Sequence, residues 1–166
     1  SQATWSPDGR HIAFVSNRSE QPDMNRNTDL WRVDVTREQP SPEQLTTAPY
    51  ADSSPVYSPD GRHVAYTSSV SAGLPVYAIP QLSILDVQTG ATRRVESLAE
   101  IQALSIRYSA DGRSILAVTE HRGEQPLVRV DVASGAAERI IAGEDVVTEF
   151  DAARDGRLLG GKSIWV

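Results

Sequence analysis

The sequence predicts an all-β fold, a fragment of a β-propeller with about three four-stranded blades and part of a fourth. Three observations support this prediction. A ten-residue string recurs at intervals of 44 to 52 residues, the runs that flank it are short and rich in Val, Ile and aromatic residues, and no segment has the periodicity of a long amphipathic helix. We therefore expect one partial propeller over residues 1–166, with no catalytic domain in it.

The recurring string is an aromatic residue, then Ser-Pro-Asp-Gly-Arg, then an apolar run. It occupies residues 5–14 and 57–66; a third copy with Ala in place of Pro occupies 108–117, and a shortened fourth covers 153–159. Pro presets one backbone angle, Asp accepts hydrogen bonds from nearby backbone, and Gly tolerates positive φ, so the string favours a tight hairpin turn. The expected structural turn residues are Asp8, Gly9, Asp60, Gly61, Asp111, Gly112, Asp155 and Gly156.

A second signature follows each hairpin and completes the four-stranded unit. Residues 86–95 match residues 131–140 at an offset of 45, and Asp34-Val35 opens the same unit in the first copy, with a longer turn. Four short antiparallel strands in each unit of this length are the pattern of a propeller blade. The expected blades are about 1–47, about 52–97, about 102–142 and a partial fourth of about 145–166.

The number of blades is about half of what a closed ring needs, which is roughly 4 to 8. The chain begins close to its first strand and stops after Ser163-Ile164-Trp165-Val166, which resembles the third strand of a blade. An open arc leaves blade faces uncovered. We therefore expect a piece of a larger polypeptide, with a self-associating half-propeller, a homo-oligomer, as the alternative.

Composition excludes several classes of partner. The chain has 16 basic and 22 acidic residues, a net charge of −6, and its basic residues are scattered, so neither nucleic acid nor a membrane is an expected partner. The absence of cysteine removes disulfides, thiolate metal sites and a cysteine nucleophile. The compartment stays unknown, with the cytoplasm slightly favoured over the periplasm.

Two motif-like features favour structural roles over chemistry, and we expect no cofactor. Residues 156–163 match the letters of a phosphate-binding loop, but strand-forming residues follow where that loop needs a helix. His11 and His63 occupy the same place in successive repeats, and no carboxylate recurs beside them. We therefore expect no metal site there or at His121.

The candidate functional residues lie on loops. In a four-stranded blade, the loops between the second and third strands share one edge with the links between blades. Residues 17–28 form a long polar segment of this kind, and residues 69–78 form a long and partly apolar one. Loops on a rigid scaffold are where contacts with partners concentrate. The candidate residues for partner contact or substrate gating are Arg18, Asp23, Arg26 and Tyr77.

The string at residues 5–14 resembles the repeat shared by TolB-type propellers and by the N-terminal propellers of the prolyl oligopeptidase family of serine peptidases. Further motifs are similar to the acylaminoacyl-peptidase and dipeptidyl-peptidase branch of that family. These motifs are Ser16-Asn17-Arg18, Gln21 to Trp31 with its Asp29-Leu30-Trp31 strand, Gln44-Leu45-Thr46, Asp52 to Tyr57 and Val76 to Leu82.

In that family the propeller precedes an α/β-hydrolase domain whose serine nucleophile lies in a Gly-x-Ser-x-Gly elbow. This chain has no such elbow, so we expect no catalytic residue in it. The resemblance implies a non-catalytic propeller that supports a hydrolase domain outside the chain and gates the access of short peptides to it. The implied partners are that hydrolase domain and a peptide substrate. The alternative is a TolB-like module that binds a protein partner and takes no part in chemistry.

Overall fold

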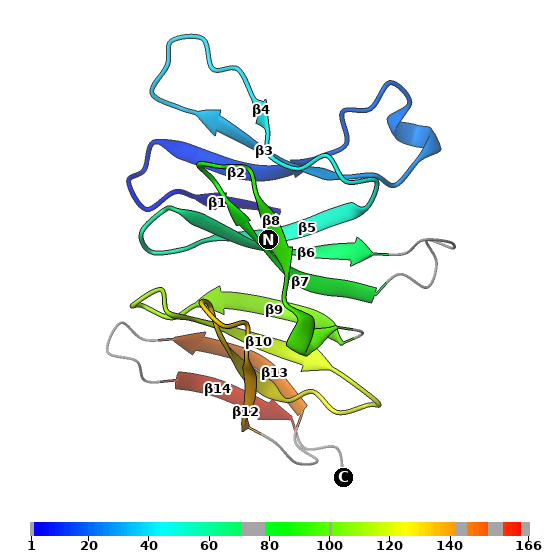
Figure 1. The fold of residues 1–166 in the computed structure, drawn as a ribbon, viewed down its shortest axis with the longest axis vertical. Coiled ribbons are helices and arrows are strands. Elements are labelled where there is room, and N and C mark those ends of the chain that lie inside the picture. The colour runs from blue at the N-terminus through cyan, green and yellow to red at the C-terminus, as the bar shows by residue number, and fades with distance from the viewer. Residues whose placement is uncertain (1, 71–78, 100, 142–145, 153–157, 164–166) are drawn as a thin grey trace.

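A computed structural model describes residues 2–70, 79–99, 101–141, 146–152 and 158–163 of the chain. In these ranges the strands form three antiparallel four-stranded sheets and one two-stranded hairpin. Figure 1 shows the sheets stacked one on another along the longest axis of the chain. The predicted fold, an all-β propeller fragment with three four-stranded blades and part of a fourth, is confirmed.

Each sheet follows chain order, because each pair of neighbouring strands is joined by a turn or loop without a crossover. The first sheet consists of β1 (Ala3–Trp5), β2 (His11–Ser16), β3 (Asp29–Asp34) and β4 (Glu43–Gln44). The second consists of β5 (Ala51–Tyr57), β6 (His63–Val70), β7 (Ile79–Asp86) and β8 (Thr92–Arg94). The third consists of β9 (Gln102–Tyr108), β10 (Ser114–Glu120), β11 (Leu127–Asp131) and β12 (Ala137–Ile141).

The remaining elements are one hairpin and two short 3-10 helices. The hairpin pairs β13 (Val146–Ala152) with β14 (Leu158–Ser163), and the helices are η1 (Pro22–Met24) and η3 (Glu96–Leu98). Residues 158–163 are therefore a strand paired along its length, which is incompatible with the loop and helix of a phosphate-binding site. No helix within the described ranges is long and apolar enough to cross a membrane.

The apolar core lies between the sheets, because each sheet presents alternate residues to its neighbour. Leu30, Tyr66 and Leu85 fill the space between the first two sheets. Leu82, Ile106 and Ile115 do the same between the second and third, and Leu116, Val147 and Phe150 lie between the third sheet and the hairpin. A fully buried Leu or Ile contributes about 1.5–3 kcal/mol, so these interfaces stabilise the stack.

The outer face of the first sheet differs from the faces between sheets. Trp5 opens the first repeat and is 58% exposed, whereas Tyr57 and Tyr108, at the equivalent position of the next two repeats, are 8% and 9% exposed. The difference arises because another described sheet covers each tyrosine, and none covers this side of β1.

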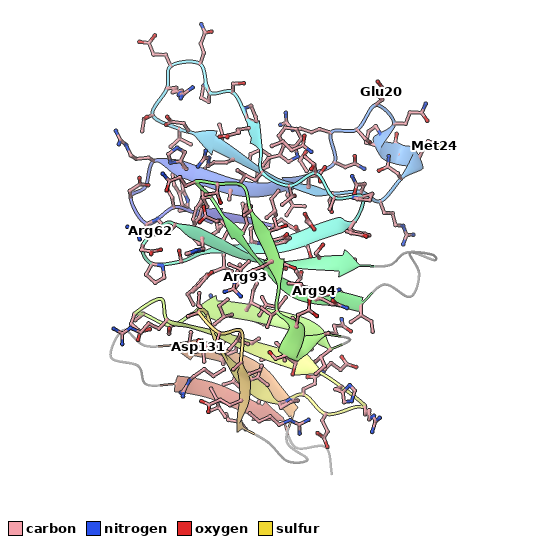
Figure 2. All side chains as sticks on the ribbon, in the orientation of Figure 1. Glu20, Met24, Arg62, Arg93, Arg94 and Asp131 are labelled. Carbon is pink, nitrogen blue, oxygen red and sulfur yellow. The ribbon has the colours of Figure 1, made fainter. Side chains whose placement is uncertain are left out.

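The stack has two opposite edges. The turns between β1 and β2, β5 and β6, and β9 and β10 lie on one edge, which we call the turn edge (Figure 1). Residues 17–28, the link from β4 to β5, and residues 121–124 lie on the other, which we call the loop edge. Figure 2 shows Glu20 and Met24 projecting from the loop edge and Arg62 lying on the turn edge.

Candidate functional site

The three described Ser-x-Asp-Gly turns have the same hydrogen bonds. In the first, the Ser6 hydroxyl donates to Asp8 Oδ1 at 2.5 Å, and the backbone N–H of Arg10 donates to the same oxygen at 3.0 Å. The hydroxyl also accepts the backbone N–H of His11. The equivalent bonds connect Ser58, Asp60, Arg62 and His63 in the second turn, and Ser109, Asp111, Arg113 and Ser114 in the third.

These bonds lower the pKa of the turn aspartates. In Asp8, Asp60 and Asp111 the serine hydroxyl makes the largest contribution and the backbone N–H the next, because both bonds favour the ionised carboxylate. Oδ1 of each carboxylate is thus occupied by its own turn. The fourth predicted pair, Asp155 and Gly156, lies outside the described residues.

The turns also contact one another across the sheets. Gly61 and Gly112 have φ of 71° and 70°, which a residue with a Cβ rarely adopts. A Cβ on Gly61 would lie 3.5 Å from Pro7 of the preceding turn, and one on Gly112 would lie 3.4 Å from Pro59. Each proline therefore packs on the glycine of the next repeat.

The histidines do not converge. His11 and His63 each begin a second strand, and their backbone groups complete the turn, while His121 begins a separate tight turn that closes on Glu124. Among the described residues, no three His, Cys, Asp or Glu side chains are grouped as metal ligands.

The loop edge carries the candidate residues, and its longest described loop is held by two asparagines. The Asn17 side-chain amide donates to the backbone oxygens of Pro22 and Asn25 and to the Asn25 side-chain oxygen, at 3.0–3.3 Å. Asn25 in turn donates to Ser19 and to the Gln21 backbone. These bonds fix the shape of residues 17–27 without burying an apolar core.

Arg18 lies over two aromatic rings at the base of this loop. Its guanidinium carbon is 5.0 Å from the centre of the Trp31 ring and 5.8 Å from that of Phe14. The two rings are adjacent because Phe14 pairs with Trp31 across β2 and β3. Stacking on the rings orients the guanidinium, and no carboxylate among the described residues forms an ion pair with it.

The structure defines less about the other three candidate residues, Asp23, Arg26 and Tyr77. Asp23 lies in η1 and Arg26 follows it, and both side chains are exposed. Neither makes a hydrogen bond or an ion pair within the described part of the chain. Tyr77 lies outside the described residues. The structure therefore brings Arg18, Asp23 and Arg26 to one loop, and only Arg18 has defined side-chain contacts.

Two buried aspartates lie behind this loop, and the sequence analysis did not identify either as a candidate. The hydroxyl of Thr28 donates to the Asp52 backbone oxygen, and the Asp52 N–H donates to the Thr28 oxygen, both at 2.8 Å, which ties the loop to the second sheet. Asp52 is 1% exposed and Asp29 is 6% exposed. The Gln44 amide donates to one Asp29 oxygen at 3.1 Å.

Burial shifts the pKa of both carboxyls upward. It raises the pKa of Asp52 to about 6, and the nearby hydroxyls of Ser68 and Thr46 offset this rise only in part. Neither Asp52 carboxylate oxygen makes a hydrogen bond of good geometry within the described ranges. The pKa of Asp29 is raised for the same reason, against the bond from Gln44. The polar run from Asp52 to Ser54 at the start of a buried strand is the sequence signal for this arrangement.

Chemically, the loop edge provides groups for binding. It presents an oriented guanidinium, exposed charges of both signs on residues 18–26, and a buried acid pair behind them. These groups suit the recognition of peptide termini and charged side chains, and they contain no nucleophile with an adjacent general base.

No protein-family model matches the chain. Among curated proteins, it is 23% identical over 154 residues to dipeptidyl-peptidase 5 of Porphyromonas gingivalis, an alignment covering 92% of this chain and 22% of that protein. It is 30% identical over 138 residues to the uncharacterized peptidase YuxL of Bacillus subtilis, covering 82% of this chain and 17% of that protein. The chain thus spans less than a quarter of the length of either relative. The predicted resemblance to the dipeptidyl-peptidase branch is confirmed.

Solved structures show the same fold. The chain is similar to TolB from Acinetobacter baumannii, with a TM-score of 0.72 and 20% identity over 96% of this chain and 37% of that one. It is also similar to a puromycin-hydrolyzing peptidase of Mycobacterium tuberculosis, with a TM-score of 0.73 and 16% identity over 96% of this chain and 27% of that one. Propellers of both the TolB type and the peptidase type therefore share the stack of sheets described above.

Proposed function

We propose that this chain is the non-catalytic propeller part of a serine exopeptidase similar to the dipeptidyl peptidases. In this proposal the loop edge frames the access of short peptides to an α/β-hydrolase domain carried by the rest of the polypeptide. The observation that supports it most is the alignment with dipeptidyl-peptidase 5, which extends over 92% of this chain and only 22% of the relative. Such an alignment leaves room for a hydrolase domain elsewhere in the protein.

The geometry supports a gating role for the loop edge over the turn edge. Each turn aspartate uses one carboxylate oxygen within its own turn, whereas Asp23 and Arg26 on the loop edge have no partner among the described residues. A rigid stack of sheets holds residues 17–28 in place, which is how scaffolds present loops for binding. Arg18 is the best positioned group for the carboxylate of a peptide.

The proposal is tested first on the natural gene product, through its intact mass and its labelling by a fluorophosphonate probe for serine hydrolases. We expect a protein several times larger than this chain that labels at one serine. Arg18→Ala and Arg26→Ala should then change kcat/KM for short peptides by several-fold while the labelling rate stays the same. Arg10→Ala, on the turn edge, is the matched control and should change neither. A product that does not label contradicts the proposal.

The second candidate is a TolB-like protein-interaction module, favoured by the TM-score of 0.72 with a TolB structure. It predicts a gene product that fails to label and captures a protein partner through the loop edge. In that case Arg18→Ala and Arg26→Ala should weaken capture, whereas Arg10→Ala should leave it unchanged.

A further inference from the structure

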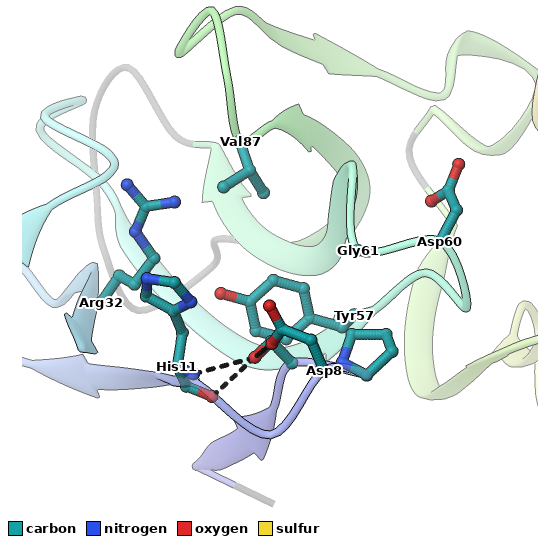
Figure 3. Close-up of a pocket in the computed structure, with 9 residues that line it drawn as sticks. Asp8, His11, Arg32, Tyr57, Asp60, Gly61 and Val87 are labelled. Carbon is teal, nitrogen blue, oxygen red and sulfur yellow. Dashed lines mark hydrogen bonds between the residues drawn. The ribbon is translucent and has the colours of Figure 1, made fainter. Parts of the chain in front are cut away.

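A pocket of about 450 Å³ lies on the turn edge between the first and second sheets. Figure 3 shows Asp8, His11 and Arg32 lining it from the first sheet, and Tyr57 and Val87 lining it from the second. This volume falls within the range of small-molecule sites, near its lower end. The pocket therefore has room for a ligand of modest size, at the edge opposite the loops.

The Tyr57 hydroxyl is a buried polar group that has no hydrogen-bond partner among the described residues. Tyr57 is only 8% exposed, and Figure 3 shows its hydroxyl on the side of the pocket that holds His11 and Arg32. Burial raises the pKa of Tyr57, so the hydroxyl keeps its proton and is able to donate it to a hydrogen bond. A buried hydroxyl without a partner costs free energy, which an acceptor on a bound molecule would recover.

Charges of opposite sign line the same pocket. Arg32 uses one guanidinium nitrogen for Glu43, at 2.6 Å, and its other N–H groups have no partner within the described ranges. Asp8 uses Oδ1 for its turn, which leaves Oδ2 available, and its pKa is lowered by the Ser6 hydroxyl, so it is ionised at neutral pH. Asp60 also lines the pocket, so a ligand there meets one guanidinium and the carboxylates of Asp8 and Asp60.

The interface between the second and third sheets shows that the repeat does not require a charged residue at the position of Arg32. Ile84 occupies on β7 the place that Arg32 occupies on β3, since they pair with the equivalent residues Ala65 and Ala13. Ile84 is 2% exposed and belongs to the apolar core between the second and third sheets. The first interface thus has a polar pocket at a place where the second has core.

We propose that this pocket binds a small zwitterion of the size of an amino acid or a dipeptide. Its carboxylate accepts hydrogen bonds from the Tyr57 hydroxyl and the Arg32 guanidinium, and its ammonium group lies against the Asp8 carboxylate, both being charge-assisted contacts. Val87 supplies an apolar wall for the rest of the molecule. This inference goes beyond the gating proposal, because the pocket and the loops lie on opposite edges.

Isothermal titration calorimetry with alanyl-alanine tests the proposal directly. We expect saturable binding by the unblocked dipeptide, and a loss of affinity of at least about tenfold when either its carboxyl is amidated or its amine is acetylated. No binding at concentrations up to about 10 mM, or equal binding by a blocked dipeptide, would overturn it. Either failure would leave the peptidase proposal untouched, since that depends on the labelling of the natural product.

Variants then assign the binding to this pocket. Tyr57→Phe removes one oxygen and keeps the buried ring, and it should weaken binding by about tenfold. Tyr108→Phe is the matched control, because Tyr108 is 9% exposed and its hydroxyl has no described partner either, in the next interface. Arg129→Ala is a second control that removes a similar ion pair, with Glu138 at 2.8 Å, away from the pocket. Wild-type affinity in Tyr57→Phe would overturn the assignment.

Discussion

Aspartates on the two edges of the stack behave in opposite ways. On the turn edge, Asp8, Asp60 and Asp111 are exposed, accept hydrogen bonds from their own turns, and have lowered pKa values. On the loop edge, Asp29 and Asp52 are buried and have raised pKa values because burial outweighs the effect of the donors near them. Folding therefore favours the ionised form of the aspartates on the turn edge and shifts the balance toward the protonated form of those on the loop edge.

This difference indicates that the two edges have different roles. On the turn edge, the three described Ser-x-Asp-Gly turns satisfy their own side chains within a few residues, although the neighbouring Tyr57 hydroxyl has no partner among the described residues. The loop edge keeps buried polar atoms with incomplete hydrogen bonding, such as the Asp52 carboxylate and the Asn27 side-chain oxygen. Departures from local consistency of this kind are expected at functional sites.

The largest change in stability is expected from the substitution Asp52→Asn. Folding raises the pKa of Asp52 from 3.8 to about 6, so its contribution to stability is complete below about pH 4 and falls as the pH rises through 6. The variant removes the buried charge and should raise the free energy of unfolding at pH 7.5 by roughly 2–3 kcal/mol, with no gain at pH 4. Urea unfolding at both pH values measures this difference.

Asp60→Asn is the matched control on the turn edge, and its sign is reversed. Because the Asp60 pKa is lowered by folding, its contribution is present above about pH 4 and is lost as the pH falls further. This variant should melt at a lower temperature than wild type at pH 7.5. If both variants were destabilised at pH 7.5, the two edges would not differ in the way described.

A smaller effect is expected from Ser58→Ala in the second turn. Ser58 is 2% exposed, donates to Asp60 Oδ1 at 2.6 Å and accepts the His63 N–H at 2.9 Å. Loss of these bonds should lower the free energy of unfolding by about 1–2 kcal/mol. Ser19→Ala on the loop edge should stay within about 0.5 kcal/mol of wild type, because Ser19 is exposed. Equal losses in urea unfolding would argue against a self-sufficient turn edge.

The smallest effect on stability is expected from Arg18→Ala. Exposed cation–π contacts contribute about 0.5–1 kcal/mol, so loss of the contacts with Phe14 and Trp31 should cost no more than about 1 kcal/mol. Arg18→Lys should recover part of this loss, and both variants are compared with wild type by urea unfolding. A loss above about 2 kcal/mol would make Arg18 a structural residue and weaken its proposed role in binding.

The turns were predictable from the sequence because their contacts are local. Ser6, Asp8 and Arg10 interact at a separation of two residues, so the residue types alone indicate the bonds. The four-stranded sheets were predictable for a related reason, since consecutive strands pair with consecutive strands. Repetition of the string then gave the number of sheets.

The binding features were less predictable because they depend on neighbouring sheets. Asp52 and the loop that ends at Thr28 are 24 residues apart and meet only when the second sheet stacks on the first. The contacts of Arg18 need the register that places Phe14 beside Trp31. The buried Tyr57 hydroxyl lies beside a polar pocket, and not within an apolar core, where Arg32 occupies the facing strand.

The packing of Pro7 on Gly61 and of Pro59 on Gly112 has a consequence for how the chain opens. Each repeat contacts its immediate neighbours, so local unfolding spreads from one repeat to the next in the manner of a one-dimensional array. The second sheet has a described neighbour on both faces, whereas the first presents Trp5 to solvent on one. Amide hydrogens of β6 should therefore exchange more slowly than those of β2, and the pocket lies between a sheet packed on both faces and a sheet packed on one face by described residues.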